Sequence, residues 1–146
     1  MAVGILEHLL PQELKGRVEA TSAGVAAAAG EPASRNAVLV SKRQGIDISG
    51  HLSRRLAPEL IEKADLTLVM QESHLAEVKR LSPERVEHAL LLTEFGDCPG
   101  GSRCDIPDPV GRSEEVYEEC FAQIESNLKR GIQFLAELVE NKEASN

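Results

Sequence analysis

The sequence has few aromatic residues, an excess of acidic over basic residues and no long apolar run. It has no tryptophan, one tyrosine and three phenylalanines, and 24 aspartates and glutamates outnumber its 16 lysines and arginines. The net charge of -8 disfavours binding to a nucleic-acid backbone, which requires a basic surface. No apolar run approaches the roughly 18 residues that a membrane-spanning helix needs. We therefore expect a chain that binds neither nucleic acid nor a membrane.

Cysteine is also scarce, and the three cysteines are an odd number. The first ten residues include Glu7 and His8 and lack the basic lead-in and apolar stretch of a secretory signal. Unpaired thiols without an export signal are typical of the reducing cytoplasm, where we place the protein. No cysteine or histidine spacing matches a zinc site, so we expect no metal and no cofactor.

The pattern of apolar residues predicts one domain over residues 1–142, followed by a disordered tail over residues 143–146. Helical periodicity covers residues 1–10, 34–44, 73–81 and 113–141, and a further helix begins at residue 57. Ser34 and Ser113 are the expected N-caps. β-Branched or continuously apolar runs predict strands at residues 17–23, 66–70 and 86–92. This alternation predicts a three-layer α/β fold, with a parallel sheet flanked by helices.

Residues 105–113, with the sequence DIPDPVGRS, are predicted to form a rigid loop around one carboxylate. Pro107 and Pro109 restrict the backbone on both sides of Asp108. Taken alone, an Asp-Pro pair indicates a turn with a solvated aspartate. The meaning of this loop therefore depends on the rest of the sequence.

Five fragments in the same order resemble the low-molecular-weight protein-tyrosine-phosphatase family, which includes bacterial protein-arginine phosphatases. Each fragment is weak evidence alone, and together they span essentially the whole chain. They are TSAG at residues 21–24, GIDISGHLSR at 45–54, ADLTLVM at 64–70, DIPDP at 105–109, and Tyr117 in the closing helix.

The resemblance implies that Asp108 is a general acid, which protonates the leaving oxygen or nitrogen and then activates water as a base. It also places Asp105, Pro109, Val110 and Gly111 in the loop beside the substrate, with Asp105 more typical of a turn or loop-pairing residue. Members of this family hydrolyse phosphate groups through a phosphocysteine intermediate. The implied partner is a phosphorylated protein or a small phosphate ester.

Three further residues have two interpretations each. Ser22 either supports the phosphate-binding loop from behind or caps a helix or turn. Arg54 and Arg55 either face the substrate cleft or are solvated surface residues, the more common situation for arginine.

The family's nucleophile motif, Cys-x5-Arg, does not occur in the sequence. Positions 110 and 126, six residues after Cys104 and Cys120, hold valine and serine, and Cys98 precedes an arginine by five residues. Met1 and Ala2 match the family where that loop has just ended. We therefore expect the first, central strand and the nucleophile loop with its arginine to be missing from this chain, which alone would be inactive. The segment 98–104 has the wrong spacing and is interpreted as a surface loop.

Other functions remain open at this point. A phosphatase-like module that binds or regulates without catalysis is the main alternative. Arsenate reduction is disfavoured, because residues 70–72 are MQE where thiol-coupled arsenate reductases have further cysteines. Val110 and Gly111 replace a bulky aromatic pair, which weakens the case for phosphotyrosine and leaves phosphoarginine or another phospho-substrate possible. The leucine-rich helix ends are compatible with a homodimer, although single apolar surface residues are common.

Overall fold

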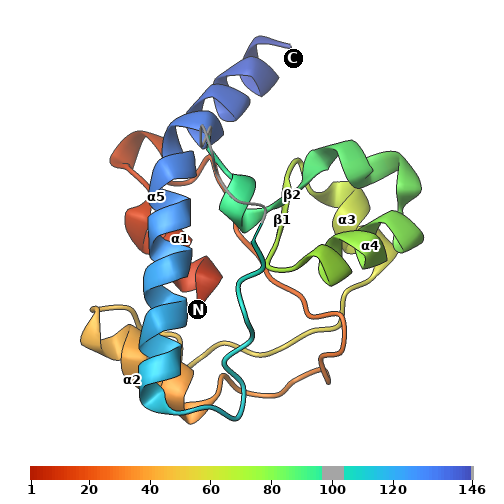
Figure 1. Ribbon diagram of the computed structural model, residues 1–146. Helices are drawn as coiled ribbons and strands as arrows, with labels where there is room; N and C mark the ends of the chain where they lie inside the picture. Colours follow the sequence, from red (N-terminus) through yellow and green to blue (C-terminus); the bar gives the residue numbers. More distant parts are fainter. Residues whose placement is uncertain (97–103, 146) are drawn as a thin grey trace.

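The computed structural model describes residues 1–96 and 104–145 of the chain. Along the sequence, the elements are α1 (Ala2–Leu9), η1 (Gln12–Leu14), α2 (Arg35–Arg43), α3 (Pro58–Lys63), β1 (Thr67–Val69), α4 (Glu72–Leu81), η2 (Pro83–His88), β2 (Ala89–Leu91), η3 (Leu92–Glu94) and α5 (Glu114–Ala144). Figure 1 shows α1, α2 and α5 on one side of the two strands and α3 and α4 on the other.

The two strands separate two apolar cores, which confirms the predicted three-layer α/β arrangement. β1 and β2 are parallel, with Leu68 opposite Leu90. Leu68 packs against the larger core, which is built mainly from α1, α2 and α5. Val69, one residue further, points to a smaller core that includes Ile61 of α3 and Val78 of α4. The alternation is that of a strand with both faces buried.

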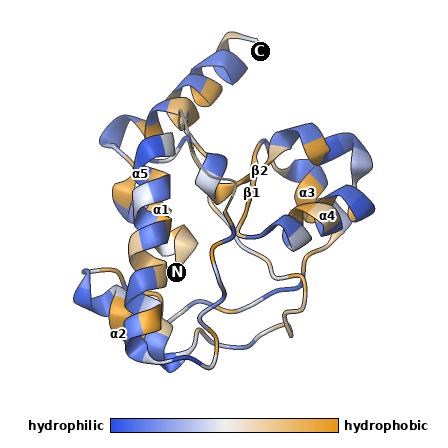
Figure 2. Ribbon diagram, in the orientation of Figure 1, coloured by the Kyte–Doolittle hydropathy of each residue, from blue (hydrophilic) through white to orange (hydrophobic). Residues whose placement is uncertain are grey.

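The helices follow the predicted amphipathic pattern closely. Ser34 caps α2 as expected, because its hydroxyl accepts a hydrogen bond from the Ala37 amide at 3.3 Å. Figure 2 shows hydrophilic and hydrophobic residues alternating along α5. This helix runs to Ala144, three residues beyond the expected end, so Glu143 and Ala144 are helical. None of the helices in the described residues combines the length and apolar character needed to cross a bilayer.

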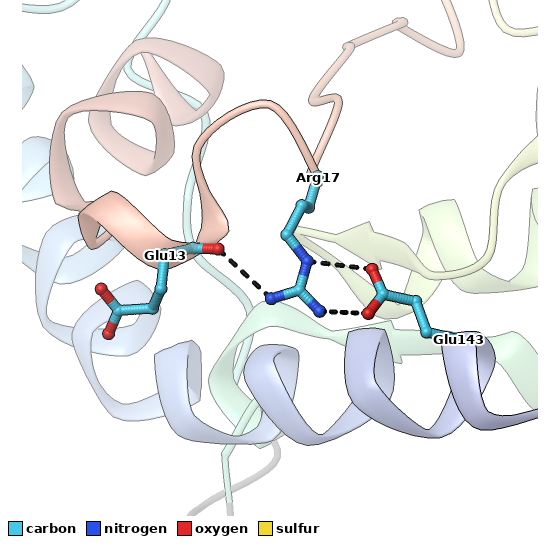
Figure 3. Close-up of polar contacts among 3 residues, drawn as sticks. All are labelled: Glu13, Arg17 and Glu143. Carbon is cyan, nitrogen blue, oxygen red and sulfur yellow. Dashed lines mark hydrogen bonds and ion pairs between the residues drawn. The ribbon is translucent and has the colours of Figure 1, made fainter.

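The predicted strand at residues 17–23 is wrong. Residues 19–23 have no regular secondary structure and pair with no strand, and Arg17 and Val18 belong to a turn in which both amides bond to the Leu14 carbonyl. Figure 3 shows the Arg17 guanidinium clamped between the Glu13 carbonyl, at 3.3 Å, and both carboxylate oxygens of Glu143, at 2.6 and 2.9 Å. The turn and the Arg17 side-chain bonds hold this segment, whereas a strand requires a neighbour in a ladder.

The predicted strand at residues 86–92 is three residues long in the structure. Its first part belongs to the 3₁₀ helix η2, which begins at Pro83, and Leu92 begins η3. A proline at the first helical position favours the helical turn there. Only Ala89–Leu91 has a parallel partner strand, which limits the ladder to these residues.

Two glycines bring the end of η3 against α5. A Cβ atom at Gly131 would lie 2.0 Å from Cδ1 of the buried Phe95 ring. A Cβ atom at Gly96, where φ is 75°, would lie 2.5 Å from the Arg130 carbonyl oxygen. Neither position has room for a side chain, so this crossing sets the rotation of α5 about its axis.

Candidate active site

A cavity of about 410 Å³ opens beside the predicted acid loop. Six parts of the chain contribute to its wall: α1, the turn at Ser22, the connector after α2, the corner between β1 and α4, the acid loop and α5. Its described lining residues are Met1, Ala2, Val3, Gly4, Glu7, Ser22, Asp47, Ile48, Gly50, His51, Met70, Gln71, His74, Ile106, Pro107, Asp108, Pro109, Cys120 and Ile124.

The first half of the acid loop is anchored to the corner between β1 and α4. The Ile106 amide donates to the Met70 carbonyl at 2.8 Å, and the Ile106 side chain is buried. The Asp105 carboxylate accepts from the Glu72 amide at 2.8 Å, at the N-terminus of α4. A carboxylate there satisfies an unpaired amide and the positive end of the helix dipole. Asp105 is thus a loop-anchoring residue and is not among the described lining residues.

The second half of the loop is held by α2. The Asn36 side chain donates to the Arg112 carbonyl at 3.3 Å, and the Ser34 hydroxyl donates to the Tyr117 hydroxyl at 2.9 Å. Arg43 forms ion pairs with Glu114 and Glu118 in the first turns of α5. The loop between these two anchors therefore connects fixed points.

Asp108 lies between the anchors and is one of the residues that line the cavity. One carboxylate oxygen accepts from the Val110 amide at 3.0 Å, which orients the side chain. Pro109 is buried and also lines the cavity, whereas Val110 is 71% exposed and Gly111 turns the chain with φ of 77°. A proton donor in this position could serve a leaving group bound in the cavity.

Ser22 lines the cavity, and the structure explains its neighbour Arg54. The Arg54 guanidinium donates to the Ser22 carbonyl at 2.8 Å and is half-buried. Arg54 was expected either to face the substrate cleft or to be a solvated surface residue. Neither interpretation includes the role that the structure shows, which is to hold the turn at Ser22. Arg55 is exposed.

Cys120 is a buried thiol in the cavity wall, which sequence reasoning did not place there. Burial raises the pKa of the Cys120 thiol, and the nearby negative charge of Asp108 raises it further. Cys120 is therefore a neutral thiol at pH 7 and differs from an activated nucleophile, whose pKa is lowered. Residues 98–103 of the segment interpreted as a surface loop lie outside the described residues.

The sequence also did not predict that three other polar residues line the same cavity. Asp47, His51 and His74 come from two segments and meet only in the fold. The one signal for Asp47 and His51 was their place in the GIDISGHLSR fragment. Within the described residues, no group of three or more His, Cys, Asp or Glu side chains is arranged to hold a metal ion.

Comparison with known proteins agrees with this architecture. The family model for low molecular weight phosphotyrosine protein phosphatase matches residues 1–144, and the chain belongs to this family. The chain is similar to a probable low molecular weight protein-tyrosine-phosphatase, EpsP, of Ralstonia solanacearum, with 35% identity over 84% of this chain and 79% of that protein.

Two solved structures show the same fold. The YwlE arginine phosphatase of Geobacillus stearothermophilus is 33% identical with a TM-score of 0.79, covering 99% of this chain and 86% of its own. The tyrosine phosphatase Wzb of Escherichia coli K30, in complex with sulphate, is 29% identical with a TM-score of 0.79, covering 92% of this chain and 87% of its own.

Proposed function

We propose that this chain acts in the hydrolysis of a phosphorylated protein in the cytoplasm, with Asp108 as general acid and then general base. The observation that carries the proposal is the position of Asp108, at the cavity and on a loop anchored at both ends, in a member of a cysteine-dependent phosphatase family. Small phosphate esters would enter the same cavity.

The proposed reaction has two steps. A cysteine thiolate attacks phosphorus and forms an S–P bond, while the P–O or P–N bond breaks and Asp108 gives its proton to the leaving atom. The Asp108 carboxylate then takes a proton from water, whose oxygen attacks phosphorus, and the thiolate and inorganic phosphate are released. Asp108 ends the cycle protonated, as it began.

We also propose that these 146 residues alone do not complete the first step. No cysteine in the sequence has the Cys-x5-Arg spacing, and the one thiol in the described cavity wall, that of Cys120, has a raised pKa. The anion-stabilising amides of a phosphate loop would also be required. The missing Cys-x5-Arg motif is equally the observation that favours the second candidate function, a non-catalytic module that binds a phosphorylated partner.

Hydrolysis of p-nitrophenyl phosphate tests both candidates. We expect no turnover by the 146-residue chain. A second chain, which carries ahead of Met1 the residues encoded by the upstream reading frame, should hydrolyse the ester if that frame encodes a strand followed by Cys-x5-Arg. Asp108→Asn in that longer chain should lower the rate of ester hydrolysis by about 10²–10⁴-fold.

The outcomes separate the two functions. A longer chain that carries the motif and remains inactive would favour the binding module. Thiol-dependent turnover by the 146-residue chain would instead show that the nucleophile lies among its own three cysteines.

A further inference from the structure

A second cavity, of about 370 Å³, opens away from the candidate active site. The two cavities share no described lining residue. Leu66 of the second cavity precedes β1, whereas Met70 of the first follows it, so the cavities open toward opposite ends of this strand. On α5, Ile124 of the first cavity and Phe134 of the second are ten residues apart, which is about 15 Å along the helix axis. The reaction proposed above therefore does not use the second cavity.

The second cavity has a partly preformed apolar wall. Its apolar side chains are those of Leu66, Leu90, Phe134 and Leu138. Phe134 is 39% exposed, although its ring meets the fully buried ring of Phe95 edge-on, at 5.9 Å between centroids. This contact already restricts the Phe134 ring, so a ligand that packs on it costs less side-chain entropy than packing on a free ring would. Exposed aromatic side chains are enriched at the surfaces where proteins bind one another.

The same wall is acidic. Asp65, Glu87 and Glu94 line the cavity together with His88, and none of its described lining residues is a lysine or an arginine. Lys142 pairs with Asp65 from outside the lining, at 2.6 Å between Nζ and Oδ2, and offsets part of that charge. Glu87 is exposed, and no hydrogen bond or ion pair joins its carboxylate to another described residue. Its negative charge is therefore available to a ligand.

Charge and shape together define what the second cavity can accept. An apolar side chain gains free energy by leaving water for the apolar wall. A neighbouring lysine or arginine gains from the carboxylates at the rim, and such charge pairs chiefly determine which partner binds and how fast. A second copy of this chain is a poor occupant, since each copy carries a net charge of -8 and like charges repel.

We propose that the second cavity is a docking site for a partner protein, and that it receives a segment in which leucine side chains are flanked by arginines or lysines. The leucine side chains pack on Phe134 and Leu138, and one flanking cation lies beside Glu87. This inference goes beyond the proposed function and does not depend on it, because no residue that takes part in the proposed reaction lines this cavity.

Titration of the 146-residue chain with three short peptides tests the proposal. The probes are acetyl-Arg-Leu-Leu-Arg-amide, acetyl-Glu-Leu-Leu-Glu-amide, which reverses the charges, and acetyl-Arg-Ser-Ser-Arg-amide, which removes the apolar side chains. The readout is the ¹H–¹⁵N spectrum, in which the Leu90 and Phe134 amides report on the second cavity and the Val110 amide reports on the loop beside the first. We expect saturable shifts at Leu90 and Phe134 with the first probe, at least about fivefold weaker binding of the other two, and an unchanged Val110 amide.

Glu87→Arg is the decisive variant, because it reverses one charge at the rim and leaves the apolar wall intact. It should weaken binding of the arginine-flanked leucine probe about threefold to tenfold and strengthen binding of the glutamate-flanked probe. Glu84→Arg is the matched control, since Glu84 is exposed in the same 3₁₀ helix, η2, and is not among the lining residues. This control should change both affinities by less than about twofold.

A second pair of variants tests the apolar wall. Phe134→Ala should remove saturable binding of the arginine-flanked leucine probe, whereas Gln133→Ala, at the exposed neighbouring position of α5, should leave it unchanged. If Phe134→Ala does not fold, the charge-reversal pair still decides the question.

Three results would overturn the proposal: equal binding of the two leucine probes, equal effects of Glu87→Arg and Glu84→Arg, or no saturable binding of any probe. Shifts at Leu90 and Phe134 that grow with protein concentration in the absence of a probe would also overturn it, because a second copy of the chain would then occupy the cavity.

Discussion

Replacing Gly131 with alanine should destabilise the protein, although the same change normally stabilises a helix. The new Cβ would lie 2.0 and 2.1 Å from Cδ1 and Cε1 of Phe95. Favourable carbon–carbon contacts occur at about 3.5–4.0 Å, so the overlap is at least about 1.4 Å. Phe95 has no exposed surface and meets Phe134 edge-on at 5.9 Å between ring centroids, so its ring has no free space to enter.

The size of the effect is the difference between two opposing terms. Overpacking of this kind costs about 1–3 kcal/mol or more, and alanine regains up to about 1 kcal/mol of helix propensity. We expect the free energy of unfolding to fall by about 1–3 kcal/mol. For a chain of this length, each kcal/mol lowers Tm by about 3–4 °C, so a drop of about 3–10 °C should appear in a calorimetric scan.

Two controls isolate the contact. Gln133→Ala, two residues along the same helix at an exposed position, tests helix propensity without the ring and should leave Tm within about 2 °C. Phe95→Leu combined with Gly131→Ala should cost less than the sum of the single changes, because the smaller side chain admits the methyl group. A Gly131→Ala protein that melts at or above the temperature of the parent would refute the close-approach explanation.

Three further predictions concern the loop and the titrating groups. Asp105→Ala should lower the free energy of unfolding by about 1 kcal/mol in urea titrations, whereas Asp105→Asn, which keeps an acceptor for the Glu72 amide, should cost clearly less; equal losses would argue against the cap. Cys120 should react with iodoacetamide at pH 7.5 far more slowly than the exposed Cys104, measured by peptide mass spectrometry, and comparable rates would contradict its burial and raised pKa. The hydrogen bond from Arg17 lowers the pKa of Glu143. The ion pair therefore stabilises the protein above the ordinary glutamate pKa of 4.5, and this contribution is lost as the pH falls through the lower pKa of the folded state. Glu143→Gln should accordingly flatten the decline of Tm below pH 4.5.

The sequence predicted the helices better than the strands, for a physical reason. A helix satisfies its backbone within one segment, so the apolar stripe of α5 and the Ser34 cap could be recognised locally. A strand exists only with a partner, and residues 17–23 have the composition of a strand without a neighbouring ladder. The periodic pattern alone could not show that Arg17 would be held in a turn by Glu143.

For the candidate site too, the sequence predicted the features that are local in the chain and not those that depend on the tertiary fold. Asp108 and its loop were predictable because prolines, aspartates and glycine are adjacent in sequence. Asp47 and Cys120 reach the same cavity from segments more than 70 residues apart, so only the tertiary structure brings them together. The Arg54 side chain was undecided for the same reason, since its acceptor, the Ser22 carbonyl, is distant in the sequence.

Residues 19–23, which pair with no strand, have a practical consequence for work with this chain. Although the Ser22 carbonyl accepts from Arg54, residues 19–23 belong to no ladder, and β1 in the described sheet has a partner strand on one edge only. Such edges template association between molecules, so the protein in concentrated solution should form aggregates rich in intermolecular sheet. Dilute storage and sedimentation at several concentrations are therefore sensible first steps with any purified sample.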